Sequence, residues 1–188
     1  MAAHALSGTP SAWVRRFAPL IPAGGTLDLA CGGGRHARLL ASLGHPVLAV
    51  DRDPEALAAC VAPGVQTDLQ DLEDGRPWPY AGRQFAGIVV TNYLHRPLFG
   101  PLFEALAPGG VLIYETFAAG NARYGKPSRP DFLLQPGELL EQTRRHGGDL
   151  HIVAFEDGYI AEPGPAMIQR ICVVRTAATQ EAGPAWAL

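Results

Sequence analysis

The stretch that decides the fold is Leu27-Asp28-Leu29-Ala30-Cys31-Gly32-Gly33-Gly34. A short apolar run ends in small residues and three glycines, and a helical pattern follows over residues 35–42. This order predicts a strand that turns sharply into a helix, because glycine accepts positive φ angles and lets the backbone approach a ligand closely. Such a turn, at the carboxyl end of the first strand of an α/β sheet, is where nucleotide-like ligands bind.

Taken alone, the turn fits more than one ligand. Gly32-x-Gly34-x-x-Ala37 also matches the dinucleotide fingerprint, and Asp51 follows about 20 residues on, as a ribose-binding acid should. Other features favour a different ligand. Asp28 stands inside the strand, where a carboxylate can hold an amino group rather than a pyrophosphate. Thr67-Asp68-Leu69 ends the third strand-like run, and Leu106-Ala107-Pro108-Gly109-Gly110 stops a helix before another buried strand.

In order along the chain, the motifs D-x-A-C-G-x-G, V-D, D-L and L-x-P-G-G resemble those of the class I S-adenosylmethionine-dependent methyltransferases. The chain is most similar to the small bacterial methyltransferases grouped with tellurite-resistance proteins, whose first motif is similar to DLACGGGRHA. The resemblance spans roughly residues 25–176, and Ala30 stands where many relatives have glycine. It implies S-adenosyl-L-methionine as cofactor. The implied fold is α/β, a Rossmann-like doubly wound seven-stranded sheet, mostly parallel with an antiparallel last strand.

The apolar pattern predicts the elements of such a sheet. Strands are predicted over 25–30, 46–51, 64–68, 85–91, 110–116, 149–155 and 167–175, and helices over 12–20, 35–43, 53–61, 97–106 and 136–146. Near-continuous apolar strands that alternate with helices indicate a parallel sheet covered on both faces. Between the last two strands, Gly158 and Glu162-Pro163-Gly164-Pro165 are predicted to turn the chain without a helix, which makes the final strand antiparallel.

Length and charge limit the domain organisation and the partners. With 188 residues and 47% hydrophobic content, the chain can bury one core, and a separate substrate domain would not fit. We expect one methyltransferase domain over 1–188, with a helical cap at 1–20, a lid-like insertion at 117–135 and a loose tail at 177–188. The net charge of −3 gives no broad basic surface for nucleic acid.

The cysteines and the N-terminus indicate a cytoplasmic location. Cys31, Cys60 and Cys172 are odd in number and far apart, which is typical of reduced core thiols, and no metal-ligand spacing is present. The opening MAAHALS lacks the basic start and long apolar region of a secretory signal. No apolar run approaches the ~18 residues of a membrane span. We therefore expect no metal and no membrane partner, and leave the oligomeric state open.

The resemblance also implies roles for cofactor-binding residues. Asp28 would hold the methionine amino group, directly or through water, with a helix-cap carboxylate as the alternative. Asp51 would accept hydrogen bonds from both ribose hydroxyls, and Asp68, with the Leu69 backbone, would read the adenine amine. The full expected set is Asp28, Ala30, Cys31, Gly32, Gly34, Arg35, Asp51, Arg52, Asp68, Leu69, Thr91 and Asn92. His36 is expected to pack, and Asp71, Glu73 and Asp74 are expected to be solvated loop charges.

The fourth predicted strand ends in Thr91-Asn92-Tyr93-Leu94-His95-Arg96-Pro97, at the edge that faces the ligand crevice. In amino-methylating relatives this place carries N-P-P-Y, so the departure argues against methylation of a base or amide nitrogen. Tyr93 and His95 are the candidate catalytic residues, because either side chain can position or deprotonate an acceptor. For His95, a capping or packing role before Pro97 is the alternative.

A long loop follows the fifth predicted strand, and such loops are usually lids or binding loops. It carries Arg123, Lys126 and Arg129 and no acid between Glu115 and Pro130, and Tyr124 adds a stacking face. The candidate substrate-binding residues are Arg96, Tyr124, Lys126 and Arg129. A lid that attracts an anionic acceptor is one interpretation, and a solvated, proline-stiffened connector is the other.

These expectations converge on methyl transfer to a small nucleophile, an anionic, thiol or metalloid acceptor. One alternative is a methyltransferase of tRNA or protein that docks through Arg15, Arg16 and the loop. Another is a non-catalytic cofactor-binding partner subunit. A nicotinamide-dependent oxidoreductase would need a second domain, for which the chain has no room.

Overall fold

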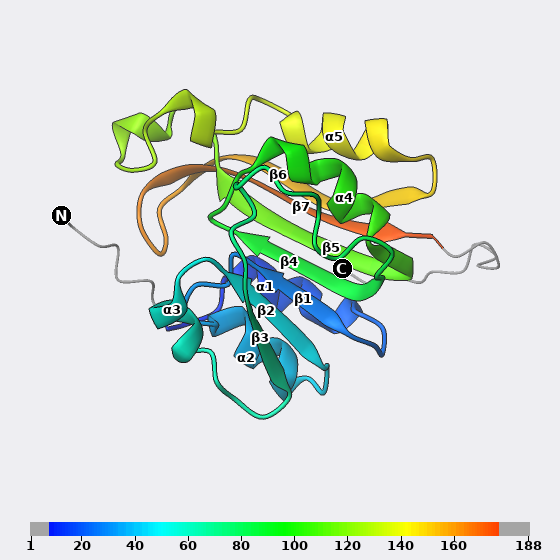
Figure 1. The fold of residues 1–188 in the computed structure, drawn as a ribbon. Coiled ribbons are helices and arrows are strands. Elements are labelled where there is room, and N and C mark those ends of the chain that lie inside the picture. Colours follow the sequence, from blue (N-terminus) through cyan, green and yellow to red (C-terminus); the bar gives the residue numbers. More distant parts are fainter. Residues whose placement is uncertain (1–7, 177–188) are drawn as a thin grey trace.

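The computed structural model describes residues 8–176, so the expectations for the N-terminal residues 1–7 and the tail at 177–188 lie outside the described residues. The strands are β1 (Thr26–Leu29), β2 (Val47–Asp51), β3 (Val65–Leu69), β4 (Phe85–Thr91), β5 (Leu106–Phe117), β6 (Leu150–Ile160) and β7 (Ala166–Arg175). They form one sheet in the order β3-β2-β1-β4-β5-β7-β6 (Figure 1). β7 is antiparallel to both of its neighbours and the other pairings are parallel. The predicted seven-stranded, mostly parallel sheet with an antiparallel last strand is confirmed.

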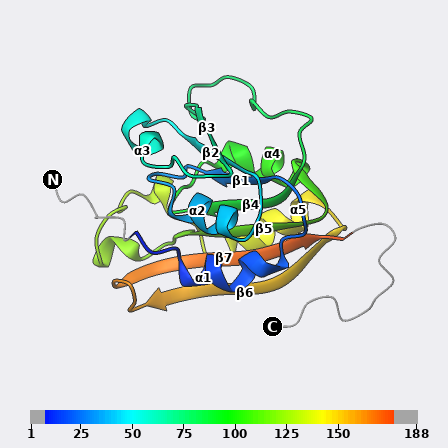
Figure 2. The ribbon, with the colours of Figure 1, turned by 90° about the horizontal axis from the view of Figure 1, so that it is seen from below.

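Helices cover both faces of this sheet. They are α1 (Ala12–Phe17), α2 (Arg35–Ser42), α3 (Pro54–Ala58), α4 (Phe99–Glu104) and α5 (Glu138–His146). One apolar core joins the sheet to α4 and α5 through Phe99, Leu102 and Leu139. The other joins the opposite face to α1, α2 and α3 through residues such as Trp13 and Leu40. Figure 2 shows α1 running along β7, where the Trp13 indole donates a hydrogen bond to the Ile171 carbonyl (3.3 Å). The sheet is therefore doubly wound, as expected.

Some boundaries differ from the sequence-based prediction. α3 ends at Ala58 rather than at residue 61, with Ala59 as its C-cap. The helix predicted over 97–106 is a 3₁₀ turn followed by the short α4, and Leu106 already pairs with Phe85 of β4. Cross-strand pairing thus overrides the helical pattern at this end.

Gly158 was predicted to turn the chain, and this is wrong. It lies within β6, paired with Ile168 of β7. The turn falls wholly after residue 160, in the segment that contains Glu162-Pro163-Gly164-Pro165. The ladder with β7 on both sides of Gly158 outweighs the weak strand preference of glycine.

The strand order fixes where a ligand can bind. The chain builds β1, β2 and β3 outward in one direction and then returns to place β4 and β5 on the other side of β1. In open α/β sheets, the crevice at such a reversal, beyond the carboxyl ends of the strands, is the ligand site. The segment 70–84 joins β3 to β4 without a helix, and the loop 118–134 leaves β5 at the same edge.

Candidate active site

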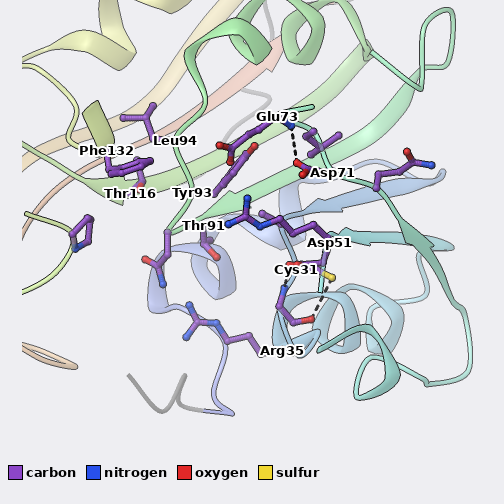
Figure 3. Close-up of a pocket in the computed structure, with 17 residues that line it drawn as sticks. Cys31, Arg35, Asp51, Asp71, Glu73, Thr91, Tyr93, Leu94, Thr116 and Phe132 are labelled. Carbon is purple, nitrogen blue, oxygen red and sulfur yellow. Dashed lines mark hydrogen bonds between the residues drawn. The ribbon is translucent and has the colours of Figure 1, made fainter. Parts of the chain in front are cut away.

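A pocket of about 440 Å³ lies at the carboxyl ends of β1, β2, β4 and β5. Its size falls in the range of roughly 300–1,000 Å³ that is usual for small-molecule sites. It is lined by Ala30, Cys31, Gly32, Arg35, Asp51, Arg52, Gln70, Asp71, Leu72, Glu73, Thr91, Asn92, Tyr93, Leu94, Thr116, Pro127 and Phe132 (Figure 3). The pocket therefore unites the glycine turn with four other segments, around residues 51–52, 70–73, 91–94 and 116–132.

The glycine turn forms the floor of the pocket. Ala30 and Gly32 have positive φ angles of 52° and 51°, and both residues line the cavity. Gly34, the N-cap of α2, has φ of 74° and does not line it. A Cβ at Gly34 would lie 2.5 Å from the Cys60 Sγ, so this glycine is required by packing against α3's C-terminal side. Gly34 thus packs against Cys60, and its expected contact with the cofactor stays a prediction.

Asp51 is held in place by backbone donors. Its Oδ2 accepts a hydrogen bond from the Gly32 N–H (2.8 Å), and its Oδ1 accepts one from the Asp53 N–H (3.0 Å). A carboxylate offers about four lone-pair sites, so these two bonds leave acceptor capacity for a ligand. Asp53, rather than Asp51, caps α3 by accepting from Glu55 and Ala56. The carboxylate of Asp51 is thus pre-oriented at the junction of the turn and β2.

Asp28 lies behind the turn rather than on the pocket surface. Its side chain is 1% exposed, and its Oδ2 has no hydrogen-bond partner among the described residues. Burial raises the pKa of Asp28 to about 7, although the Ala37 N–H and Arg35 act in the opposite direction. Because Asp28 does not line the pocket, this placement argues against a direct contact with a ligand. A contact through water stays a prediction.

The segment after β3 presents different residues from those expected. Asp68 does not line the pocket, because it accepts hydrogen bonds from the Tyr80 hydroxyl (2.8 Å) and the Gln70 amide (3.2 Å), and Leu69 is exposed. Asp71 and Glu73, expected as solvated charges, line the pocket instead, together with Gln70 and Leu72. The Gln70 N–H bonds to the Asp51 carbonyl (3.0 Å) and carries the chain one residue further along the sheet edge. The sequence analysis missed that the residues directly after Leu69 also lie at this edge of the sheet.

Tyr93 lies in the pocket and His95 does not. Figure 3 shows the Tyr93 ring pointing toward Glu73. Burial, and then the charge and hydrogen bond of the Glu73 carboxylate, raise the pKa of Tyr93 above its usual value, so the phenol stays neutral. The Tyr114 hydroxyl donates to the Tyr93 carbonyl (2.8 Å) and fixes the backbone there. The His95 carbonyl accepts from the Leu98 N–H (3.0 Å), while its side chain makes no capping hydrogen bond.

Four more of the expected cofactor residues supply polar side chains to the pocket lining. Arg35, the first residue of α2, and Thr91, the last of β4, line the pocket, as does the exposed Arg52. Burial lowers the pKa of Arg35, and the carboxylates of Glu115 and Asp28 oppose that shift. Asn92 follows Thr91 with a positive φ of 55° and also lines the cavity.

Arg96 was expected to contact a substrate, and the structure gives its guanidinium other partners. It forms a bidentate pair with Glu138 (2.7 and 2.9 Å) and donates to the carbonyls of Asp131 (2.8 Å) and Leu133 (2.9 Å). These bonds join the 3₁₀ turn that precedes α4 to the end of the long loop. Arg96 therefore anchors the loop rather than facing the pocket.

The long loop reaches the pocket through apolar residues. Pro127 and Phe132 line it, whereas Tyr124, Lys126 and Arg129 do not. Arg129 pairs with Asp131 (3.0 Å) and lies over the Phe132 ring, and Tyr124 packs on Tyr159 of β6. At the base of the loop, Leu134 donates to the Phe117 carbonyl (3.0 Å) and Ala119 donates to the Leu134 carbonyl (2.8 Å).

Part of this chain is similar to known methyltransferases. A family model described as a methyltransferase domain matches residues 26–110. The trans-aconitate 2-methyltransferase of Rhizobium meliloti (strain 1021) is 33% identical over 132 residues, which are 66% of this chain and 46% of that protein. The chain thus spans about half the length of that relative.

Solved structures share the fold. TehB from Haemophilus influenzae superposes with a TM-score of 0.67 at 19% identity, covering 93% of this chain and 63% of that chain. An S-adenosylmethionine-dependent methyltransferase from Mesorhizobium loti gives 0.65 at 20% identity, covering 88% and 99%. Within residues 8–176, no helix is long and apolar enough to cross a bilayer, and no three His, Cys, Asp or Glu residues are grouped to hold a metal.

Proposed function

We propose that this chain is a class I S-adenosylmethionine-dependent methyltransferase, which transfers the sulfonium methyl group of S-adenosylmethionine to a small-molecule acceptor. The methyltransferase-domain match over residues 26–110, the trans-aconitate 2-methyltransferase relative and the shared fold support this proposal. The observation that carries this proposal is the pocket of about 440 Å³ that joins the glycine turn, the oriented Asp51 carboxylate and the Tyr93 edge of β4. Methyl transfer is an in-line displacement, so the protein chiefly supplies alignment, worth on the order of 7–11 kcal/mol in favourable cases.

The lining suggests how the cofactor would lie. Asp51 would accept from the ribose hydroxyls, and Arg35 with Thr91 would face the methionine carboxylate. Gln70 and Asp71 lie where Asp68 and Leu69 were expected to meet the adenine, and we propose that they share this contact. Gln70 and Asp71 lie along the same edge of the pocket as the residues at the ends of β1 and β2.

The acceptor would occupy the remaining part of the pocket, between Tyr93, Thr116, Pro127 and Phe132. Tyr93 stays a neutral phenol, so it would align an acceptor and not deprotonate it. An acceptor that is already anionic near neutral pH, such as a carboxylate, thiolate or metalloid oxyanion, needs no base. The exposed Lys126 and Arg129 would attract such an anion at long range rather than by contact.

Small-molecule acceptors are supported by the named relatives, which include a trans-aconitate 2-methyltransferase. A methyltransferase of tRNA or protein, and a non-catalytic partner subunit, are the alternatives. The net charge of −3 speaks against the tRNA alternative.

Calorimetric titration tests the cofactor. We expect S-adenosylhomocysteine, the demethylated product, to bind with micromolar affinity and NADH to show no comparable isotherm. Tighter binding of NADH than of S-adenosylhomocysteine would overturn the proposal.

A transfer assay tests the acceptor. Methyl-labelled S-adenosylmethionine is incubated with the protein and either trans-aconitate or fractionated cell extract, and labelled products are sorted by size. We expect label in the small-molecule fraction. Label in RNA or protein would favour a macromolecular acceptor, and cofactor binding without any labelled product would favour a non-catalytic subunit.

A further inference from the structure

His36 joins two distant segments to the pocket edge. Its ring is 1% exposed and lies between residue 11 of the N-terminal segment and the last residue of β4. The Ser11 N–H donates to the His36 Nε2 (3.1 Å), and the His36 Nδ1 lies 3.3 Å from the Thr91 Oγ1. Sequence reasoning expected this histidine only to pack.

The two contacts fix the position of the ring proton. A backbone N–H can only donate, so Nε2 carries no proton. Burial, with the nearby Arg35 charge, lowers the pKa of His36 to about 3, so the ring is neutral near pH 7. The single ring proton is therefore assigned to Nδ1, from the hydrogen-bond network. The Thr91 Oγ1 must accept this bond, which leaves its own hydroxyl hydrogen for another partner.

The Thr91 hydroxyl hydrogen is available to a group in the pocket. Thr91 lines the pocket, and among residues 8–176 its hydroxyl has no hydrogen-bond partner other than His36. Figure 3 shows Thr91 and Arg35 on the same side of the cavity. A ligand oxygen placed there would meet a hydroxyl donor and a guanidinium.

We propose that His36 is a positioning residue, which holds the Thr91 hydroxyl as a hydrogen-bond donor to an anionic oxygen of the pocket ligand. The inference rests on the proposed function, in which this oxygen belongs to the carboxylate of the cofactor's methionine moiety. His36 itself does not touch the ligand and acts through Thr91.

The N-terminal segment does not depend on His36 alone. The Ser11 hydroxyl donates to the Glu115 carboxylate (2.8 Å), which also accepts from Arg170 (3.1 Å). Trp13 and Phe17 are buried in the core beneath. A variant of His36 can therefore lose its contact with Thr91 while the segment stays docked, which makes the proposal testable.

The test is a double-mutant cycle with S-adenosylhomocysteine as the probe, measured by calorimetry at pH 7.5. Thr91→Val removes the hydroxyl at nearly constant shape, and Thr91→Ser keeps it. His36→Gln can replace the Nε2 contact but not the Nδ1 donor, whereas His36→Asn can place an amide donor near Thr91. We expect Thr91→Val and His36→Gln each to weaken binding about 10-fold, as for a hydrogen bond to a charged group. Thr91→Ser and His36→Asn should stay within about 3-fold of wild type.

The double variant gives the decisive result. If His36 acts through Thr91, His36→Gln with Thr91→Val should bind no more weakly than Thr91→Val alone. Melting temperatures are measured for each variant. A packing role would be favoured, and the proposal overturned, by either of two results. In the first, the fold losses in affinity of the two single variants multiply in the double variant. In the second, His36→Gln loses affinity only under conditions in which its melting temperature is also lowered.

Nitrogen-15 spectra of the histidine rings test the proposal without any ligand. The His36 signals, assigned by their loss in His36→Gln, should show the neutral ring protonated at Nδ1. A ring protonated at Nε2, or at both nitrogens, would overturn it. Wild-type protein that binds no S-adenosylhomocysteine would instead reject the proposed function, so the two failures are distinguishable.

Discussion

Asp51 both stabilises the glycine turn and lines the pocket. Its two oxygens accept the N–H groups of Gly32 and Asp53, and its side chain lines the pocket. Neighbouring Asp53 caps α3 and does not line the pocket. The two carboxylates therefore form a matched pair in which one lines the pocket and the other caps a helix.

Replacing Asp51 by alanine should weaken S-adenosylhomocysteine binding by about 1.5–3 kcal/mol, the range for hydrogen bonds to a charged group, or roughly 10- to 150-fold. Calorimetry measures the change. Asp53→Ala, the control, should lower the free energy of unfolding by about 1 kcal/mol through loss of the cap and leave affinity nearly unchanged. Equal affinity losses in both variants would contradict the assignment of Asp51.

Asp28 should give the protein a recognisable pH dependence. Its pKa rises from 3.8 to about 7 on folding, because burial disfavours the carboxylate. Between these values the folded state binds more protons than the unfolded state, so stability due to Asp28 is present at low pH and falls as pH rises toward 7.

Asp28→Asn removes this titration. Urea unfolding at pH 4, 6 and 8 should show the variant gaining stability relative to wild type as pH rises, with the difference levelling above pH 7. A pH-independent difference between the two proteins would contradict the raised pKa of Asp28.

Among the elements, the start of α2 depends on one glycine of the turn more than on its neighbour. A Cβ at Gly34 would meet the Cys60 Sγ at 2.5 Å and the Cys60 Cα at 3.0 Å, and φ is 74°. A Cβ at Gly33 would lie 4.0 Å from the Ala59 Cβ, which is an ordinary contact, and the φ of Gly33 is not in the positive region.

Gly34→Ala should therefore lower the free energy of unfolding by at least about 1–2 kcal/mol, from a left-handed residue and a forced shift against Cys60. Gly33→Ala is the control and should change stability by less than about 0.5 kcal/mol. Urea unfolding of both variants measures this. Similar losses in the two variants would show that the turn tolerates no side chain at either position.

The loop 118–134 is held to the sheet by Asn121, which is 1% exposed. Its amide donates to the Pro127 carbonyl (3.0 Å), and its carbonyl oxygen accepts from the Met167 N–H of β7 (3.1 Å). Pro127 in turn lines the pocket, so this side chain couples β7 to the pocket wall.

Asn121→Ala should remove both hydrogen bonds, whose partners are half-buried, at a cost of about 0.5–1.5 kcal/mol for each bond. Hydrogen exchange should then be faster for the amides of 118–134 than for those of β4, with a lower melting temperature. Ser128→Ala, an exposed change in the same loop, is the control and should alter neither. Unchanged exchange in Asn121→Ala would mean that the base of the loop suffices to hold it.

At the scale of the whole molecule, the pocket joins both halves of the sheet. Its walls come from β1 and β2 on one side of the reversal and from β4 and β5 on the other. A ligand in this position contacts both halves only when the sheet is folded, so binding should stabilise the whole described fold.

At 100 times its dissociation constant, a ligand adds about 2.7 kcal/mol of stability. For a domain of this size, S-adenosylhomocysteine should therefore raise the melting temperature by roughly 5–11 °C. NADH at the same concentration should give no comparable shift. Calorimetric melting curves provide the measurement, and equal shifts with the two ligands would contradict a site selective for the sulfonium cofactor's product.

Sequence-based reasoning went furthest where local chemistry decides the outcome. The glycine run predicted the strand-to-helix turn, and the apolar runs predicted all seven strands, because strand burial and glycine conformation follow from the residues themselves. The ordered motifs also predicted the methyltransferase family, which the match over residues 26–110 supports. The same reasoning placed Gly158 in a turn, because it weighed the local preference of glycine above the ladder with β7.

Tertiary structure alone decided which polar side chains share the pocket. β3 ends at Leu69, and the irregular segment after it brings Gln70, Asp71 and Glu73 to the pocket wall, while the Asp68 carboxylate accepts a hydrogen bond from Tyr80. The bond between His36 and Thr91 joins residues 55 positions apart, and Arg96 meets Glu138 across 42. Sequence by itself determined the turn and the strands, since those depend on neighbouring residues. Contacts between distant segments depend on how the packed elements are oriented, and no local pattern carries that information.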